Sequence, residues 1–273
     1  MIESERKQII DLVRREVIPA IGCTEPIAVA LCVAKAVETL GTKPENIKVF
    51  LSANILKNAM GVGIPGTGMI GLPIAVALGA IIGKSEYQLE VLKDSTPEAV
   101  KLGKQYINEK RVCISLKEGI AEKLYIEVLC EAEGKVATAI IAGGHTTFIY
   151  IARGEEILFS KQPVGTEEQD EQNLDLNLKK VYDFALTAPL EEIRFILETA
   201  RLNKAAAESS FQGDYGHALG KVLRGRYEHQ IMGDSVFSHI LSYTSAACDA
   251  RMAGAMIPVM SNSGSGNQGI SAT

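Results

Sequence analysis

Apolar residues near the start of the chain repeat at helical spacing. Residues 3–18 carry an apolar stripe and predict an amphipathic helix that ends before Pro19. Residues 27–40 are Ala-rich and apolar on most sides, which predicts a buried helix. Residues 69–82 are also apolar, but they are few for a membrane span and are interrupted by glycine and proline. They therefore predict another buried helix.

In the middle of the chain, the spacing of apolar residues changes from that of helices to that of strands. Short segments rich in β-branched residues predict strands over residues 47–51, 111–116, 124–130, 137–141 and 148–152. A helix over residues 97–108 falls between the first two of them. Because strands and helices do not alternate as in repeated βαβ units, the pattern predicts an α+β fold with a small antiparallel sheet and no Rossmann unit.

A polar, acidic stretch separates this region from the rest of the chain. Residues 154–176 include Glu167, Glu168, Asp170 and Glu171, and they predict a linker. Beyond it the pattern predicts only helices, over residues 176–186, 189–209, 217–223 and 236–256. We therefore expect two domains: an α+β domain over residues 1–160 and an all-helical domain over residues 175–273.

Composition and charge narrow the class of partner. Apolar residues make up 47% of the chain, enough for a sizeable core, and the net charge of -5 disfavours nucleic acid and anionic membranes as partners. The first residues are charged and show no secretory signal, and five cysteines without a CxxC pair suit a reducing compartment. We expect a cytoplasmic protein that binds a small molecule.

The run IGCTEP at residues 21–26 places a cysteine at the break between two predicted helices. Thr24 can cap the second helix, and Glu25 suits its first turn. Cys23 then lies at a helix N-terminus, where amides and dipole favour an anion. We expect its thiolate to form more easily than that of free cysteine and to act as a nucleophile or metal ligand. A small, half-buried residue in a tight turn is the alternative.

A glycine-dense loop precedes the apolar helix predicted over residues 69–82. The loop, GVGIPGTG at residues 61–68, exposes backbone amides that can hold a carboxylate or phosphate. The candidate side chains and loop residues are Asn54, Lys57, Asn58, Gly66 and Thr67. The loop is not a Walker A sequence, because no Gly-Lys-Ser/Thr follows. Close packing through small residues is the alternative.

Histidines and strand cysteines give weaker signals. His145, in the run GGHTT, can serve as an acid, a base or a hydrogen-bond donor, or it is a satisfied turn histidine. Cys113 and Cys130 fall within predicted strands, where a cysteine is more often a small core residue than a ligand. The remaining histidines, His217, His229 and His239, have no i,i+4 spacing, so they predict no metal site.

A second polar loop lies near the end of the chain. Residues 261–270 read SNSGSGNQGI and concentrate hydroxyls, amides and bare backbone. Such a loop can bind a small zwitterion through neutral hydrogen bonds, with contacts from Asn262, Ser263, Ser265, Asn267 and Gln268. A flexible linker is the alternative.

Three motifs together resemble one family in order and spacing: GCTEP, residues 57–68 with PGTG, and RMAGA at residues 251–255 followed by SNSGSGNQG. The chain resembles the L-cysteine desulfidase family, whose uncharacterised bacterial members are similar to the alpha chain of iron-sulfur L-serine dehydratases. This resemblance covers essentially the whole chain. It implies a four-iron four-sulfur (4Fe-4S) cluster held by three cysteines, with one iron open to substrate. It also implies conversion of L-cysteine to pyruvate, ammonia and hydrogen sulfide without pyridoxal phosphate.

The resemblance assigns one cluster ligand in this chain. Cys23 matches the family's N-terminal ligand, whereas the other two ligands of the family lie beyond the SNSGSGNQG loop. Neither Cys32 nor Cys248 matches a ligand position. Because the chain ends at Thr273, we expect a C-terminally truncated form that does not hold the cluster stably.

Three functions stay open: a lyase acting on L-cysteine or L-serine, an inactive amino-acid-binding protein, and a subunit completed by another polypeptide. For the lyase, Glu25 and Lys57 are candidate general bases. The expected substrate-binding residues are Thr24, Asn54, Asn58, Gly66, Thr67, Asn262, Ser263, Ser265, Asn267 and Gln268. A homodimer is the default expectation for association.

Overall fold

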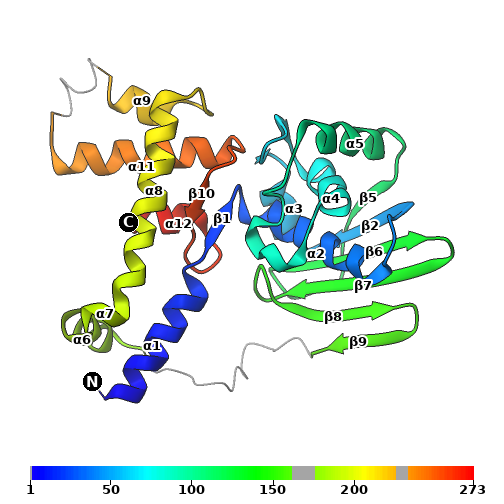
Figure 1. The fold of residues 1–273 in the computed structure, drawn as a ribbon, viewed down its shortest axis with the longest axis horizontal. Coiled ribbons are helices and arrows are strands. Elements are labelled where there is room, and N and C mark those ends of the chain that lie inside the picture. Colours follow the sequence, from blue (N-terminus) through cyan, green and yellow to red (C-terminus); the bar gives the residue numbers. More distant parts are fainter. Residues whose placement is uncertain (1, 162–175, 226–232) are drawn as a thin grey trace.

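The chain forms a sheet lobe and a helical lobe (Figure 1). The structure is a computed structural model and describes residues 2–161, 176–225 and 233–273. In the sheet lobe, helices cover one face of a mixed β-sheet, and the helical lobe combines the C-terminal helices with the N-terminal helix. The arrangement confirms the predicted α+β class.

A six-stranded sheet with the order β5-β2-β6-β7-β8-β9 is the frame of the sheet lobe. Its strands are β2 (Asn46–Leu51), β5 (Val112–Leu116), β6 (Tyr125–Ala132), β7 (Lys135–Ala142), β8 (Phe148–Arg153) and β9 (Glu156–Ser160). All neighbours pair antiparallel except β2 and β5, which are parallel. The antiparallel expectation is wrong for that pair, because helices carry the chain back across the sheet between the two strands.

Helices pack on one face of this sheet. They are α2 (Thr24–Leu40), α3 (Ala53–Ala59), α4 (Leu72–Ile81), the 3-10 helix η1 (Ser85–Glu90) and α5 (Pro97–Asn108). Along β6, buried Ile126, Val128 and Cys130 alternate with half-buried residues, as expected for a sheet with one covered face. Cys130 is therefore a core residue, as predicted, but Cys113 is exposed, because it lies on the other face of β5.

Several predicted segments differ from the structure. The helix expected over residues 189–209 is divided into α7 (Leu190–Ile193), η2 (Arg194–Ile196) and α8 (Leu197–Gln212), and the region expected to be all-helical contains strand β10 (Pro258–Met260). The helix expected over residues 69–82 begins only at Leu72, after a short hairpin of β3 (Gly63–Ile64) and β4 (Met69–Ile70). The linker expected over residues 154–176 begins with strand β9, and residues 162–175 of it lie outside the described residues. Within the described ranges, no helix has the length and apolar character needed to cross a membrane.

The helical lobe has a small-residue core. Its helices are α1 (Glu3–Glu16), α6 (Leu178–Thr187), α7 (Leu190–Ile193), η2 (Arg194–Ile196), α8 (Leu197–Gln212), α9 (Leu219–Leu223), α11 (Val236–Met252) and α12 (Gly266–Ser271). Buried alanines of α8 and α11 let these helices pack closely, and the rings of Phe211 and Tyr243 meet edge to face at 5.2 Å. Arg6 of α1 donates two hydrogen bonds to Glu192, at 2.8 and 3.1 Å, which joins the N-terminal helix to this lobe.

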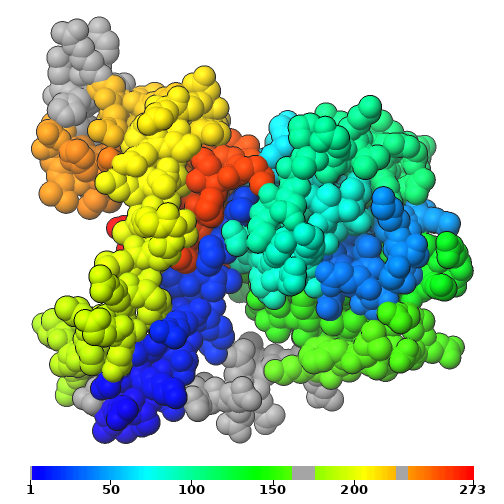
Figure 2. Space-filling model, in the orientation of Figure 1, coloured from blue at the N-terminus to red at the C-terminus, as the bar shows by residue number. Residues whose placement is uncertain are grey.

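Segments near the two ends of the chain pair between the lobes. Strand β1 (Pro19–Ile21) pairs antiparallel with β10 (Pro258–Met260). The backbone amide and the hydroxyl of Ser261 both donate to the carbonyl of Ile18, at 2.9 and 2.7 Å. Figure 2 shows the C-terminal segment, in orange and red, between the yellow helices and the sheet lobe. This pairing brings the SNSGSGNQG loop toward GCTEP, about 240 residues away in sequence.

Candidate functional site

A carboxylate at the start of α2 collects three hydrogen bonds. Cys23 is the N-cap residue of α2 and is 5% exposed, and its Sγ donates to Oε2 of Glu25 at 2.9 Å. Thr24 Oγ1 donates to the same oxygen at 3.2 Å, and Asn58 Nδ2 of α3 donates to Oε1 at 3.4 Å. The structure thus brings together four residues that the sequence singled out: Cys23, Thr24, Glu25 and Asn58.

The thiol of Cys23 is harder to ionise than that of free cysteine. Burial and the neighbouring charge of Glu25 raise the pKa of Cys23 to about 12, although the charge of Arg251 opposes the shift. The expectation of an easily formed thiolate is wrong, because desolvation and a carboxylate outweigh the helix N-terminus. Cys23 is a neutral hydrogen-bond donor in this state.

Glu25 is the ionised partner in the cluster. Burial raises the pKa of its carboxyl group, but hydrogen bonds from Cys23 and its own backbone amide, the charge of His145 and the hydroxyl of Thr24 outweigh this and hold the pKa below the ordinary value. A carboxylate so stabilised is a weak base.

His145 provides an imidazole that interacts electrostatically with this carboxylate. It lies in the loop between β7 and β8, and a Cβ built on Gly264 would lie 2.3 Å from its Nδ1. Burial lowers the pKa of His145, Glu25 opposes this, and the charge of Arg251 adds to it. Within the part of the chain that the structure describes, neither ring nitrogen has a hydrogen-bond partner. The ring is therefore neutral near pH 7 and free to take a proton.

Arg251 places a buried positive charge next to these groups. It lies in the last turn of α11, is 4% exposed, and its charge influences both Cys23 and His145. Its Nη1 donates to Oδ1 of Asn267 at 2.8 Å and reaches the sulfur of Met252 at 3.5 Å. Its Nε is buried and has no hydrogen-bond partner among the described residues.

The C-terminal loop is held by its own contacts and by α1. The amide of Ser263 donates to the carbonyl of Glu16 at 2.9 Å, and its hydroxyl donates to Asn262 at 3.2 Å. Ser265 caps α12 by accepting from the amide of Gln268, whose side chain is exposed. Of the loop residues predicted to bind substrate, Asn267 is the one bonded to a charged group of the site.

Other predicted residues lie apart from the cluster. Asn54 and Lys57 are exposed on α3, and the side chain of Lys57 has no hydrogen bond or ion pair to another described residue. Gly66 and Thr67 line a separate hollow of about 350 Å³ with Lys101 and Lys104, and the Thr67 hydroxyl bonds within its own turn. This loop packs against the segment after Arg251: the Gly66 amide donates to the Gly254 carbonyl at 3.2 Å, and Gly63 lies against the backbone of Ala253 and Gly254.

The described cysteines do not form a cluster site. Cys32 and Cys130 lie in the sheet-lobe core, Cys113 is exposed, and Cys248 packs in the helical lobe, so Cys23 is the one described cysteine bonded to Glu25. Across residues 2–161, 176–225 and 233–273, no group of three or more His, Cys, Asp or Glu side chains is placed to hold a metal. These residues do not fit a cluster held by three cysteines.

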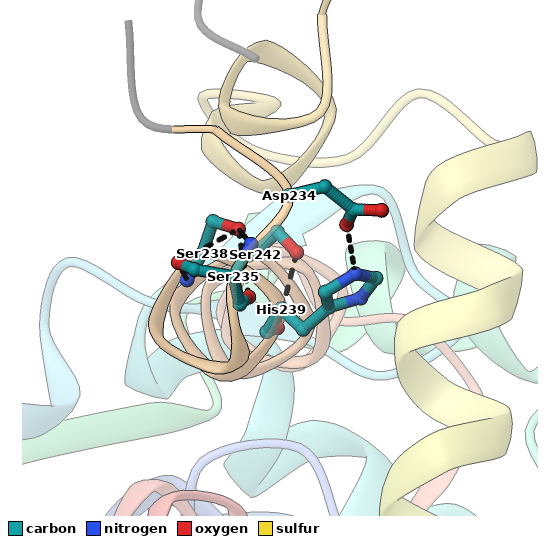
Figure 3. Close-up of polar contacts among 5 residues, drawn as sticks. All are labelled: Asp234, Ser235, Ser238, His239 and Ser242. Carbon is teal, nitrogen blue, oxygen red and sulfur yellow. Dashed lines mark hydrogen bonds and ion pairs between the residues drawn. The ribbon is translucent and has the colours of Figure 1, made fainter.

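Another polar group, at the start of α11, has a structural role. His239 Nε2 lies 2.5 Å from a carboxylate oxygen of Asp234, and Ser235 and Ser238 form a capping box there (Figure 3). His239 also borders a hollow of about 600 Å³ between α8, α11 and α12. His229 lies outside the described residues.

Sequence reasoning missed two residues that organise the site. Arg251 stood out only as part of a motif, because its burial and its neighbours depend on the meeting of the chain ends. Asn203 of α8 is 5% exposed; its Oδ1 accepts from the amide of Met260 at 2.8 Å, and its Nδ2 donates to the carbonyl of Gly269 at 3.2 Å. The sequence signal that could have identified Asn203 is a single polar residue on an apolar helix face.

A family model for the serine dehydratase alpha chain matches residues 86–273, which include His145, Arg251 and the SNSGSGNQG loop. The chain belongs to the serine dehydratase alpha chain family. This confirms the resemblance predicted from the motifs at the level of the family. Cys23 and Glu25 lie outside the matched segment.

Similar proteins from several bacteria share the name UPF0597 protein. A UPF0597 protein of Bacteroides fragilis is 83% identical over 273 residues, which is 100% of this chain and 64% of the relative. UPF0597 proteins of Porphyromonas gingivalis and Oleidesulfovibrio alaskensis are 47% and 44% identical, and in both the match covers 100% of this chain and 64% of the relative. The chain thus spans less than two thirds of the length of these relatives. No solved structure matches the chain.

Proposed function

We propose that this family member provides proton transfer and substrate binding in a lyase of the L-cysteine desulfidase type, which releases sulfide from L-cysteine and forms pyruvate and ammonia. The observation that best supports this proposal is the neutral imidazole of His145. It has no hydrogen-bond partner among the described residues and interacts electrostatically with the ionised Glu25. A buried base next to a fixed carboxylate suits removal of a weakly acidic α-proton.

The proposed reaction balances without an oxidant or reductant. The Cα–H bond breaks, His145 takes the proton, and the electron pair forms the Cα=Cβ bond. The Cβ–S bond breaks, and sulfur leaves with its electron pair as hydrosulfide. The 2-aminoacrylate tautomerises to an imine, which water hydrolyses to pyruvate and ammonia. Glu25 stabilises the imidazolium that forms, because the two groups interact electrostatically. L-Serine would react in the same way, with its hydroxyl group as the leaving group.

The 4Fe-4S cluster belongs to this proposal through the family resemblance. The resemblance gives Cys23 as one ligand of such a cluster, which would supply Lewis-acid assistance to the leaving group. It would need two further thiolates, and the other described cysteines lie elsewhere. The proposal for the described residues is therefore limited to what His145, Glu25 and the polar loop do to the substrate.

Turnover tests the proposal. The protein is purified anaerobically, reconstituted with iron and sulfide, and assayed for pyruvate from L-cysteine and from L-serine. We expect pyruvate from one or both, and a loss of kcat of about 10²- to 10⁴-fold in His145→Gln with little change in KM. The matched control is His217→Gln, because His217 is exposed in the helical lobe. Equal loss in both variants, or none in His145→Gln, contradicts the assignment of the base.

The second candidate is an amino-acid-binding protein without turnover. The neutral state of Cys23 and the dispersed cysteines support it. Saturable binding of L-cysteine by reconstituted protein that forms neither pyruvate nor sulfide would favour this candidate over the lyase.

Location and association are also proposals. All five cysteines are free, which supports a reducing compartment such as the cytoplasm. A homodimer is the default proposal for its association, and light scattering at several protein concentrations tests it.

A further inference from the structure

The guanidinium of Arg251 is a buried charge whose hydrogen bonds go to neutral groups. Its hydrogen-bond partners are the amide oxygen of Asn267 and the sulfur of Met252, and no carboxylate of the described residues forms an ion pair with it. Its Nε–H is buried without any partner there. A buried cation of this kind is costly unless an anion completes its bonding, so the site lacks one negatively charged group.

We infer that Arg251 binds the carboxylate of an amino-acid ligand. A planar guanidinium matches a carboxylate through parallel N–H donors, and burial strengthens such a contact. The bond from Nη1 to Asn267 fixes the plane of the guanidinium, and Nε and Nη2 have no hydrogen-bond partner among the described residues. Gly266 lies against Arg251 and Gly264, two residues earlier, lies against His145, so a ligand anchored on Arg251 lies near the proposed base.

A purely structural role explains these contacts less well. A basic residue in the last turn of a helix favours the helix dipole, and Arg251 is in the last turn of α11. That role requires neither burial to 4% exposure nor an Nε–H without a partner. An exposed lysine would serve it at lower cost.

The backbone of Gly266 covers the guanidinium in the present state. A Cβ built on Gly266 would lie 2.2 Å from Nε of Arg251, so this contact is possible only for glycine. A carboxylate therefore reaches Nε when the segment of residues 264–266 moves away from Arg251. The same movement uncovers His145, because Gly264 lies against its ring.

Ligand binding tests the inference directly. The inference rests on the proposed function and names the residue that anchors the substrate carboxylate. The probe is L-alanine, which has the amino and carboxylate groups but no leaving group. Calorimetry on the intact protein compares L-alanine with L-alaninamide. We expect loss of the carboxylate, and separately Arg251→Met, to weaken binding by about ten- to a hundredfold. The matched control Arg201→Met, at an exposed arginine of α8, leaves the affinity unchanged.

Each outcome is decisive. Equal affinity of the wild-type protein for L-alanine and L-alaninamide overturns the inference even if Arg251→Met does not fold. Unchanged L-alanine affinity in a folded Arg251→Met variant also overturns it. Binding that depends on the carboxylate and on Arg251, without pyruvate from L-cysteine or L-serine, supports the anchor and counts against the lyase. Pyruvate formation with no such dependence supports the lyase and rejects the anchor.

Discussion

Arg251 Nη1 donates a 2.8 Å hydrogen bond to Oδ1 of Asn267, and this bond joins the end of α11 to the first turn of α12. Between these two residues the chain forms β10, which pairs with β1, and the loop that covers His145. The site therefore depends on segments from both ends of the chain. Its ionisable groups come from α2, the β7–β8 loop and α11.

Replacement of Arg251 by methionine separates a stability role from a binding role. Because the arginine leaves a buried Nε–H unpaired, we expect Arg251→Met to change the free energy of unfolding by less than about 1 kcal/mol, in either direction. Urea denaturation measures this. A loss of about 3–5 kcal/mol is typical of breaking a buried ion pair and would show that Arg251 has a charged partner in the folded chain.

Glu25 controls the reactivity of Cys23. Burial is the largest cause of the raised pKa, so it stays above the ordinary value in Glu25→Gln, but loss of the carboxylate charge lowers it. The rate of iodoacetamide labelling of Cys23 should rise about tenfold for each unit by which its pKa falls. Peptide mass spectrometry follows the labelling. Glu38→Gln, a change further along α2, is the control, and an equal response in both variants contradicts the account.

Gly134 and Gly264 have similar backbone angles, so alanine substitutions at the two positions distinguish the cost of a left-handed backbone from the cost of a steric contact. Gly134 has φ +71° with open space around it, whereas Gly264 has φ +74° and faces His145. Alanine at Gly134 should cost about 1–2 kcal/mol for the left-handed conformation alone. Alanine at Gly264 should cost more and should also displace the imidazole, which lowers turnover and L-alanine affinity. Equal losses of stability in urea unfolding would show that the loop moves freely off His145.

Much of the sheet lobe follows from sequence pattern, and most of the site does not. The alternation in β6 and the apolar body of α2 predict elements with the observed burial. Periodicity gives no information on strand partners, so the parallel pair β2–β5 was missed, and β9 was missed because all its residues are exposed. The helix N-terminus of Cys23 was predicted, but its pKa depends on burial and on the orientation of Glu25, which only the fold determines.

Stability should fall in mild acid because of His145. Its pKa in the folded chain lies below the ordinary 6.5, so the folded state binds fewer protons than the unfolded state. This contribution is present above about pH 6.5 and is lost as the pH falls toward the lower folded value. Glu25, whose pKa is lowered from 4.5, adds a second loss at lower pH. Urea midpoints between about pH 7.5 and pH 5.5 should fall less in His145→Gln than in the wild type. Parallel curves would contradict this assignment.

The release of pyruvate and sulfide from L-cysteine by anaerobically reconstituted protein tests the central claim most directly. The account predicts equal amounts of pyruvate and sulfide from the wild-type protein and from His217→Gln, with formation strongly reduced in His145→Gln. Saturable L-cysteine binding without either product, or full turnover by His145→Gln, would contradict it.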